Sequence, residues 1–416
     1  MNERIPYSGR VYDNREIENL TKAVEEFWLT AGHWTAEFEK KLANYLNLPF
    51  CLFVNSGSSA NLLAFMALTS PLLGDRAIKR GDEIITVAAG FPTTIAPIIQ
   101  FGAIPVFADI SIPQYNIDVS QLENALSKKT KAVVIAHTLG NPFDISAVKK
   151  FCEKNSLWLI EDNCDAFGSE YTFGTETCKT GTFGDIGTSS FYPPHHITTG
   201  EGGAVYTKNP LLHKIMHSMR DWGRDCVCES GVDNKCGNRF NRQFGELPFG
   251  YDHKYVYSHF GYNLKATDLQ AAIGVAQLDK LPAFVEKRRE NWNFLRKNLE
   301  HLQDKFILPE AFSNSNPSWF GFAISCKQGT NRQKIVEHLE SKNIQTRMLF
   351  AGNIIKHPCF DQMRKTGEGY RVAGSLECTD FVMENMFWVG VYPGLDEGKL
   401  LKVTKAIEES FRTEAQ

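Results

Sequence analysis

Residues 189–203 bring two prolines, two histidines and a glycine cluster close together, in the order SSFYPPHHITTGEGG. Proline fixes the backbone and glycine permits tight turns, so we expect the adjacent His195 and His196 to be held rigidly. An imidazole can accept and donate a proton near neutral pH. The segment therefore predicts a proton-transferring site. A stiff loop with a hydrogen-bonded histidine pair is the alternative.

Three of the ten cysteines lie in one polar segment, as Cys226, Cys228 and Cys236, and Cys164 lies upstream of them. In a long chain without a secretory signal, cysteines favour metal ligation or buried thiols over disulfides. Four thiolates suit an iron–sulfur cluster or tetrahedral zinc, although Cys-x-Cys is a tight spacing for zinc. Four unrelated buried thiols are the alternative.

The turn formed by Gly57, Ser58 and Ser59 opens an apolar segment at 62–68 that we expect to be helical. Such a turn offers backbone N–H groups and the positive end of a helix dipole, which suit a phosphate. Serine is also a common N-cap, so the motif alone does not decide between the two roles.

Strand-like and helix-like segments alternate between residues 83 and 160, which predicts βαβ units and a mostly parallel sheet covered on both faces. Ligands of such sheets bind at the carboxyl ends of strands, where Phe91 and Asp162 lie in this sequence, with Asp165 three residues further on. An aspartate at a strand end is also a common helix cap. The expected strands are 83–88, 105–108, 132–136 and 157–160, and the expected helices are 93–100, 119–125 and 145–153.

The length of the chain predicts about two domains. The expected division is a large domain over 1–285 and a small α/β C-terminal domain over 286–416, linked by the helix at 284–299. Residues 220–262 lack periodicity and are rich in Gly, Asn, Asp and aromatic residues, which predicts a long functional loop. Further helices are expected at 14–46, 263–278, 284–299, 331–341 and 397–411, and further strands at 319–325 and 346–350.

The overall composition is that of an ordinary globular enzyme, with 416 residues, 43% hydrophobic and 22% charged. The net charge of −3 argues against a large nucleic-acid-binding surface. The start of the chain does not resemble a signal peptide, and no apolar run approaches the length of a membrane span. We therefore expect a cytoplasmic protein with no membrane partner.

The histidine segment resembles the active-site stretch of the DegT/DnrJ/EryC1/StrS-type sugar aminotransferases, which use pyridoxal phosphate. In that family Ser-Phe, three residues and then a lysine precede a glycine-rich turn. Ser190 and Phe191 match, but His195 stands at the position of the lysine that binds the cofactor as a Schiff base. Imidazole cannot form that bond. The resemblance implies fold type I, which is aspartate aminotransferase-like, with a mixed, mostly parallel sheet between helices and a smaller α/β C-terminal domain.

The resemblance also implies roles for individual residues. Phe91 would stack on the pyridine ring, and Asp162 would keep the ring nitrogen protonated, which makes the ring an electron sink. Asn263 would reach the cofactor phosphate of a neighbouring subunit, which implies a homodimer with shared active sites. The other implied cofactor-binding residues are Gly57, Ser58 and Ser59 at the phosphate, Asp165 at the ring hydroxyl, and Ser190; Arg347 and His196 are assigned to the substrate.

His195 and the cysteine loop together resemble one branch of the family over about residues 8–412, the iron–sulfur, pyridoxamine-phosphate-dependent nucleotide-sugar 3-dehydrases. The matching motifs are 56–61, 136–141 and 251–255. The resemblance implies pyridoxamine 5′-phosphate and a 2Fe–2S cluster bound by Cys226, Cys228, Cys236 and Cys164. Cys178, in the long segment 171–179, is the alternative fourth ligand.

The implied reaction is 3-dehydration of a nucleotide-linked 4-keto-6-deoxyhexose, CDP-4-keto-6-deoxy-D-glucose, with His195 as the base. It would serve 3,6-dideoxyhexose formation for lipopolysaccharide, with electrons from a flavin/iron–sulfur NADH-dependent reductase. The cysteine loop disfavours a colitose-type 3-dehydratase without a cluster, and the missing lysine disfavours a 4-aminotransferase. An inactive electron carrier or scaffold would not need Asp162, Phe91 and the phosphate turn. The nucleotide, the reductase and the role of His196 stay open.

Overall fold

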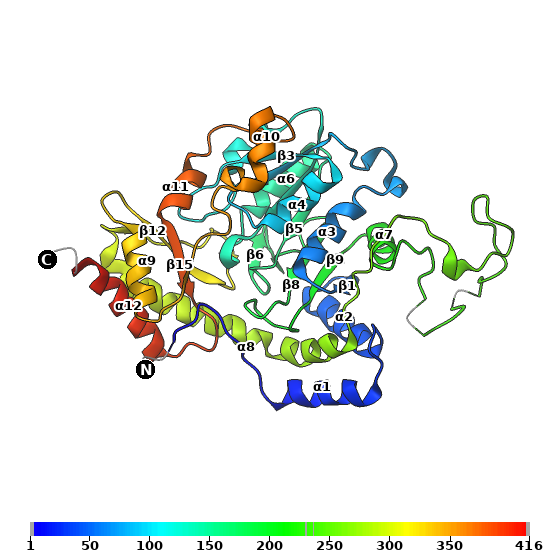
Figure 1. Ribbon diagram of the computed structural model, residues 1–416, viewed down its shortest axis with the longest axis horizontal. Coiled ribbons are helices and arrows are strands. Elements are labelled where there is room, and N and C mark those ends of the chain that lie inside the picture. Colours follow the sequence, from blue (N-terminus) through cyan, green and yellow to red (C-terminus); the bar gives the residue numbers. More distant parts are fainter. Residues whose placement is uncertain (1–3, 229–230, 236, 413–416) are drawn as a thin grey trace.

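The computed structural model describes residues 4–228, 231–235 and 237–412. Its centre is an eight-stranded sheet with the order β1-β9-β8-β5-β4-β2-β3-β14 (Figure 1). β9 runs antiparallel to both of its neighbours, and every other pair is parallel. The strands are β1 (Phe50–Val54), β2 (Glu83–Val87), β3 (Ile104–Ala108), β4 (Thr130–Ala136), β5 (Trp158–Asp162), β8 (Ile186–Ser190), β9 (Gly203–Thr207) and β14 (Arg371–Val372). The predicted mixed, mostly parallel sheet is confirmed.

Helices cover both faces of this sheet, because its central strands are apolar on both sides. In β4, Val133 and Ile135 belong to the core under α5 (Leu122–Ala125) and α6 (Ile145–Lys154). The alternate residues Ala132 and Val134 belong to the core on the opposite face. That face is covered by α3 (Gly57–Ala67), α4 (Pro92–Phe101) and α7 (Pro210–Arg220).

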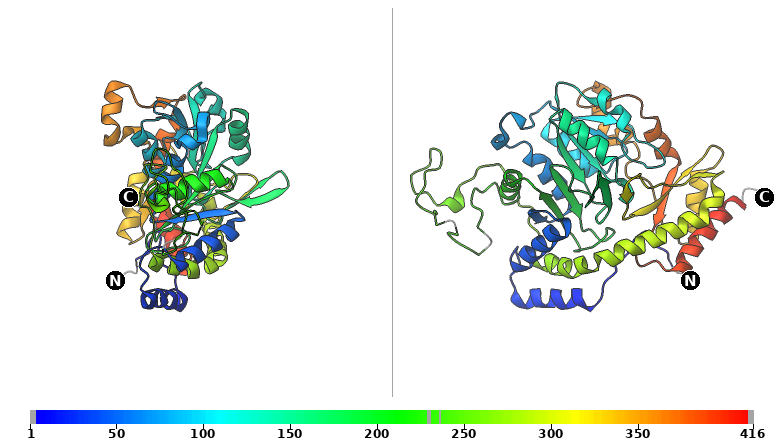
Figure 2. Two further views of the ribbon diagram at one scale, coloured as in Figure 1. Left: turned by 90° about the vertical axis from the view of Figure 1, so that its right-hand side faces the viewer. Right: turned by 180° about the vertical axis from the view of Figure 1, so that it is seen from behind.

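A second, antiparallel sheet has the order β10-β12-β15-β13 and its own core, shared with α9, α12 and the end of α8 (Figures 1 and 2). A three-stranded sheet, β11-β6-β7, lies apart from it. The elements are β6 (Glu170–Phe173), β7 (Glu176–Lys179), β10 (Phe306–Ile307), β11 (Ser315–Asn316), β12 (Gly321–Cys326), β13 (Thr346–Arg347), β15 (Met386–Gly390), α8 (Asp268–Leu299), α9 (Arg332–Ser341), α10 (Asp361–Thr366), α11 (Glu377–Asn385) and α12 (Glu397–Arg412).

The boundary at 285 falls inside α8, a single helix of 32 residues that packs against α1, α2 and α12. β14 also belongs to the large sheet, although it comes from the C-terminal part of the sequence. The division into 1–285 and 286–416 stays a prediction. The prediction of two helices at 263–278 and 284–299 is wrong. The helix continues through Pro282 because Leu281 and Phe284 are buried in the core beneath it.

The segment 14–46, expected to be helical, forms two helices, α1 (Asn14–Glu26) and α2 (His33–Leu46), with a turn between them. Phe27 ends α1 in the left-handed region, with φ of 53°. The buried carboxylate of Asp268 accepts hydrogen bonds from the N–H of Gly32 at 2.8 Å and of Thr35 at 3.0 Å. A side chain far away in the sequence therefore fixes where α2 begins.

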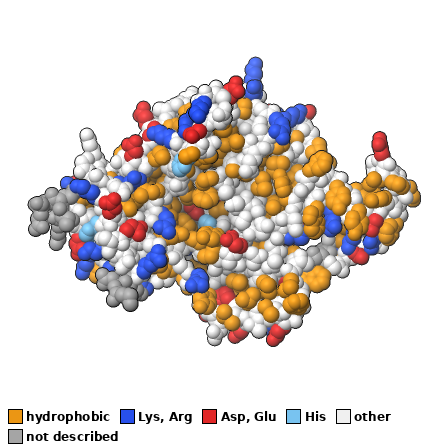
Figure 3. Space-filling model, viewed as in Figure 1, with side chains coloured by type: hydrophobic (Ala, Val, Ile, Leu, Met, Phe, Trp, Pro, Cys, Tyr) orange, Lys and Arg blue, Asp and Glu red, His pale blue; other side chains and the backbone are white. Residues whose placement is uncertain are grey.

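The described residues between 225 and 258 form an arm that projects from the body of the molecule (Figures 1 and 2). Bridges between Asp221 and Asn263 and between Arg224 and Tyr257 close its base. Apart from a 3₁₀ turn at His253–Tyr255, the described part of the arm has no helix or strand, as the prediction of a long loop at 220–262 requires. It exposes large apolar side chains, seen at the right of Figure 3, including those of Phe240, Phe249 and Tyr255. Within the part of the chain that the structure describes, no helix has the length and apolar character needed to cross a membrane.

Glu161, in β5, is a buried carboxylate that ties the strand to its surroundings. It accepts hydrogen bonds from the N–H groups of Gly181, Phe183 and Gly184 at 2.9, 2.7 and 2.5 Å. The ring of His137 contacts it at 3.0 Å. Burial opposes the charge of Glu161, but the His137 contact and these donors outweigh burial and hold its pKa below the ordinary value of 4.5.

Because the pKa of Glu161 is lower in the folded than in the unfolded chain, its stabilising effect is full above about pH 5 and is lost as the pH falls through the folded value. We expect Glu161→Gln to lower the free energy of unfolding at pH 7 by about 2–3 kcal/mol. The variant should also lose stability less steeply than the parent below pH 5, as measured by denaturant unfolding. The control Glu153→Gln, at an exposed ion pair with Lys149, should change stability by less than about 0.5 kcal/mol. Equal acid sensitivity of parent and Glu161→Gln would contradict this account.

Candidate active site

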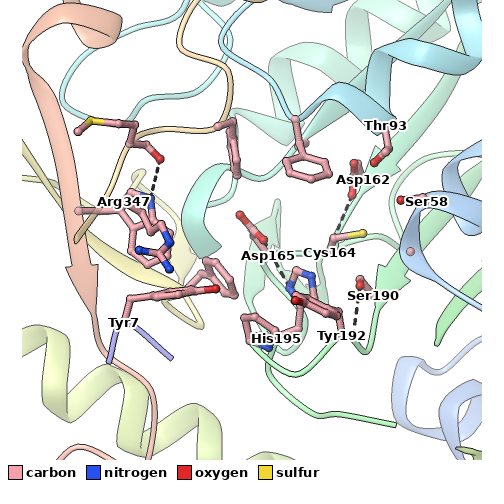
Figure 4. A pocket seen from close by; sticks show the side chains of 18 residues that line it. Tyr7, Ser58, Thr93, Asp162, Cys164, Asp165, Ser190, Tyr192, His195 and Arg347 are labelled. Carbon is pink, nitrogen blue, oxygen red and sulfur yellow. Dashed lines mark hydrogen bonds and ion pairs between the residues drawn. The ribbon is translucent and has the colours of Figure 1, made fainter. Parts of the chain in front are cut away.

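A cavity of about 390 Å³ lies at the carboxyl ends of the parallel strands, where they face the smaller sheet (Figure 4). It has two ends. In Figure 4, Ser58, Asp162 and Cys164 lie on one side, Arg347 and Tyr7 on the other, with Asp165 and His195 between them. The lining residues that the sequence predicted are Gly57, Ser58, Phe91, Asp162, Cys164, Asp165, Ser190, His195 and Arg347.

Asp162 is fixed at the end of β5 by three hydrogen-bond donors. The side chain of Asn61 donates to it at 2.8 Å, and the hydroxyl of Thr94 donates at 2.6 Å. The N–H of Cys164 donates to its other oxygen at 3.1 Å. Thr188 donates to the Asn61 side-chain oxygen at 2.7 Å, which orients the amide. The carboxylate is therefore rigid and points into the cavity.

The first turn of α3 forms the wall beside Asp162. Ser56 caps the helix by accepting from the N–H of Ser59 at 3.0 Å, while Gly57 and Ser58 line the cavity. A Cβ atom at Gly57 would lie 2.4 Å from the Cβ of Ser190, so only glycine lets the turn approach β8 this closely. The N–H groups of a first helical turn have no partner within the helix and suit an anion. Ser59 itself does not line the cavity; its hydroxyl contacts that of Ser56.

His195 follows a tight turn in which its N–H donates to the carbonyl of Tyr192 at 2.9 Å. Its Nδ1 lies 3.5 Å from a carboxyl oxygen of Asp165, and its ring centroid lies 5.2 Å from that of Phe320. The buried guanidinium of Arg288 donates to its carbonyl at 3.1 Å. The two prolines of the sequence thus lead into a loop that holds the imidazole against the cavity.

Burial shifts the two titratable groups at the centre of the cavity in opposite directions. Burial, followed by the positive charge of Arg288, lowers the pKa of His195 to about 4. Burial, followed by the negative charge of Asp162, raises the pKa of Asp165 to about 8. At neutral pH the imidazole is therefore uncharged and able to accept a proton, and Asp165 carries its proton.

These residues fit a phosphorylated pyridine. The first turn of α3, which Gly57 lets approach β8, offers backbone N–H groups to a phosphate, and Asp162 offers a fixed carboxylate to a ring nitrogen. Phe91, half exposed at the start of α4, offers an aromatic face. No lysine is among the cavity-lining residues that the structure describes. The cavity can therefore hold such a cofactor without a covalent bond to it.

The other end of the cavity is built from segments that the sequence did not connect to the site. The guanidinium of Arg347 lies 4.0 Å over the ring of Tyr7. Tyr7 in turn packs edge-on against Trp388 in β15, with ring centroids 5.4 Å apart. Neither aromatic belongs to a recognisable motif, so only the folded chain reveals them. The remaining lining residues that sequence reasoning missed are Thr93, Ala136, Tyr192, Pro194, Phe320, Met348 and Phe350.

Two predicted residues lie outside this cavity. His196 is buried behind it, where its Nε2 contacts the carbonyl of Ser318 at 2.8 Å. Its assignment to the substrate stays a prediction. Asn263 is exposed at the base of the arm, where its side chain accepts from Lys265 at 2.9 Å. Its predicted role in a neighbouring subunit remains a prediction.

The predicted cluster ligands are not gathered in the described structure. Cys164 lies in the cavity, Cys226 and Cys228 lie in the arm, and Cys178 lies on β7. Cys236 lies outside the described residues. Across residues 4–228, 231–235 and 237–412, no three His, Cys, Asp or Glu side chains are grouped so that they could hold a metal ion.

Cluster ligands bind as thiolates, whereas burial, followed by the carboxylate of Asp162, raises the pKa of the Cys164 thiol well above its usual value. The cysteines among the described residues do not by themselves form a cluster site, and the cluster stays a prediction.

Comparison with known proteins gives the same fold and related chemistry. The chain is 54% identical over 409 residues to the lipopolysaccharide biosynthesis protein RfbH of Salmonella typhimurium, a match that covers 98% of this chain and 92% of that protein. It is 49% identical over 404 residues to dTDP-4-dehydro-2,6-dideoxy-D-glucose 3-dehydratase of Saccharopolyspora spinosa, a match that covers 97% of this chain and 85% of that protein. A solved structure of E. coli GDP-4-keto-6-deoxy-D-mannose-3-dehydratase with bound hydrated PLP superposes with a TM-score of 0.84 at 27% identity, covering 98% of this chain and 100% of that chain.

The predicted aspartate aminotransferase-like fold is therefore confirmed by both the topology and the solved structure. The model of one family, the DegT/DnrJ/EryC1/StrS aminotransferases, matches residues 11–408. Because the match spans nearly the whole sequence, the chain belongs to the DegT/DnrJ/EryC1/StrS aminotransferase family.

Proposed function

We propose that this protein catalyses the 3-dehydration of a nucleotide-linked 4-keto-6-deoxyhexose, using pyridoxamine 5′-phosphate held without a covalent bond. One observation carries the proposal: an uncharged imidazole, that of His195, lies in a cavity with a fixed carboxylate and an anion-binding helix turn, and the described lining includes no lysine. The names of two relatives, which are 3-dehydratases of nucleotide-linked sugars, support the same reaction class.

Four features of this chain would hold the cofactor. The first turn of α3, at Gly57 and Ser58, would bind its phosphate, with Ser190 beside that turn. Asp162 would face the ring nitrogen, and Phe91 the face of the ring. Asp165, which carries a proton near neutral pH, would donate a hydrogen bond to a ring oxygen. When bound, pyridoxamine phosphate supplies an amine to the 4-keto carbon and a ring that accepts electrons.

His195 would move the proton. With the cofactor bound, its neutral imidazole would accept a proton from the C4′ carbon and would donate it to the 3-hydroxyl oxygen of the sugar, which would leave as water. In an aminotransferase, the primary amine of the lysine displaces the amino sugar from the cofactor. His195 has no primary amine and cannot do this. This difference favours dehydration over 4-amination, the second candidate that the family allows.

Arg347 would meet the charged nucleotide part of the substrate. It lies at the opposite end of the cavity from the α3 turn, beside the aromatic side chains of Tyr7 and Trp388. CDP-4-keto-6-deoxy-D-glucose is the predicted substrate, while the names of the two relatives give dTDP- and GDP-linked sugars. A screen of CDP-, dTDP- and GDP-linked 4-keto-6-deoxyhexoses, followed by loss of substrate, identifies the nucleotide.

We also propose a homodimer in which Asn263 reaches the neighbouring cofactor site, as the resemblance implies. The exposed position of Asn263 at the base of the arm supports this. The two electrons that C-3 deoxygenation needs after dehydration are not assigned to any residue of this chain. The 2Fe–2S cluster and the flavin/iron–sulfur NADH-dependent reductase stay predictions.

We expect His195→Asn to slow substrate dehydration by about 10²–10⁴-fold, because a positioned general base is removed. Binding of pyridoxamine phosphate, followed by its absorbance, should be unchanged, since the substitution leaves the α3 turn and Asp162 intact. His33→Asn, at an exposed histidine, is the control and should retain the parental rate. Dehydration by His195→Asn at the parental rate would place the base elsewhere.

We expect borohydride treatment of the parent protein loaded with pyridoxal phosphate to leave no cofactor on any peptide, because no lysine lines the described cavity. His195→Lys restores a primary amine at this position. Borohydride should then fix the cofactor on the peptide that contains residue 195, as peptide mass spectrometry detects. A cofactor fixed on a lysine of the parent protein would contradict the proposed non-covalent site.

The cluster prediction is tested by anaerobic reconstitution. We expect about two irons and two sulfides per chain, and a paramagnetic resonance on one-electron reduction. Cys228→Ser should abolish both, whereas Cys359→Ser, at an exposed cysteine outside the predicted set, should not. Stoichiometric zinc without iron, or a silent resonance after reconstitution, would overturn the prediction.

A further inference from the structure

Arg288, in the middle of α8, is a buried cation directly behind the histidine loop. Its side chain is among the largest fully enclosed ones, with 2% of its surface exposed. One terminal nitrogen donates to the carbonyl of His195 at 3.1 Å, and the other donates to the carbonyl of Trp319 at 3.1 Å. The guanidinium thus bridges the histidine loop and the chain entering β12.

Burying a guanidinium is costly unless a counter-charge or hydrogen bonds compensate. Burial lowers the pKa of Arg288 to about 9, so it remains charged at neutral pH. Among the residues that the structure describes, no carboxylate lies within 4.0 Å of it, and its Nε has no hydrogen-bond partner. An apolar side chain would fill the same space at lower cost. We therefore look for the role of the Arg288 guanidinium in its two hydrogen bonds and not in packing alone.

The two carbonyls that Arg288 binds belong to the two walls of the cavity. His195 forms one wall, and Phe320, the residue after Trp319, forms the other, with ring centroids 5.2 Å apart. A second link reinforces the first, since His196 contacts the carbonyl of Ser318 at 2.8 Å. The planar fork of a guanidinium can bind two carbonyls in one fixed geometry, which a lysine ammonium cannot.

We infer that Arg288 is a positioning residue for the proton transfer: by holding the His195 and Trp319 peptides at a fixed separation, it places the His195 imidazole against the reacting carbon. This inference rests on the proposed role of His195 as the base. Arg288 does not line the main cavity, so it acts through His195 and not on the substrate.

Arg289 is a matched control on the same helix. It also donates to two backbone carbonyls of the segment before β12, those of Pro317 at 3.0 Å and Asn316 at 3.1 Å. It faces away from the cavity, near Glu170, and makes no contact with the histidine loop that the structure describes. Loss of either arginine removes two hydrogen bonds to backbone carbonyls, but only Arg288 binds His195.

The first measurement uses the protein without cofactor. Hydrogen exchange, followed by mass spectrometry, reports how firmly the peptide covering residues 192–199 is held. We expect Arg288→Met to speed exchange in this peptide by about tenfold, because one charged hydrogen bond to the loop is lost. Arg289→Met should leave this peptide unchanged. Parental exchange in Arg288→Met would overturn the inference.

The second measurement uses the loaded protein and the substrate that the nucleotide screen identifies. Arg288→Met should lower kcat by about 10–10²-fold with little change in KM, as expected when a reacting group is displaced by about 1 Å. Arg288→Lys, which keeps the charge and one donor, should recover part of the rate, and it also replaces Arg288→Met should that variant fail to fold. Arg289→Met should keep the parental kcat.

The outcomes separate this inference from the proposed function. If His195→Asn dehydrates at the parental rate, the proposed base is wrong. If His195→Asn is impaired while Arg288→Met and Arg288→Lys both keep the parental kcat, the base is right and the positioning role of Arg288 is wrong. An equal loss of kcat in Arg288→Met and Arg289→Met would show a general structural effect and would also overturn the inference.

Discussion

The site depends on one buried carboxylate, that of Asp162, and on the three donors that hold it. Asn61 comes from α3, Thr94 from α4, and the N–H of Cys164 from the chain after β5. Each of these elements begins or ends at the cavity, so the contacts fix the helix starts to the strand end. An ion without such partners would be costly to bury, and the partners would be unsatisfied without the ion. The position of the Asp162 carboxylate and the positions of its three donors therefore depend on each other.

Much of this arrangement could be predicted from the sequence because its signals are local. The apolar run of β5 ends at Asp162, the Gly-Ser-Ser turn begins α3, and the prolines precede His195. Each signal lies within a few residues of the side chain that it positions. The order of strands and helices then places these ends at one edge of the sheet. The prediction thus followed from periodicity, turn chemistry and one topological rule, with the family resemblance supplying the roles.

What the sequence could not predict depends on contacts between distant segments. The start of α2 is set by Asp268, and Pro282 is tolerated in α8 because the neighbouring apolar residues are buried. Tyr7, Phe320 and Trp388 meet in the cavity although nothing in their local sequence marks them. The role of Arg288 could not be predicted either, because it depends on hydrogen bonds to two carbonyls on other segments. The cysteine spacing was a local signal, but metal ligands must lie close together in the folded chain. The described cysteines are not grouped in that way.

The composition of the cavity has a consequence for how the protein is synthesised. The end that holds Gly57, Asp162 and His195 comes from the first half of the chain, whereas the opposite end needs Arg347 and Trp388. Tyr7 emerges among the first residues, yet its partners emerge nearly last, and the neighbouring Ile5 pairs with Ile344. During translation, domains generally fold as units from the N-terminus. The nascent chain must therefore keep its leading segment unpaired until β15 has left the ribosome, and only then can the cavity close.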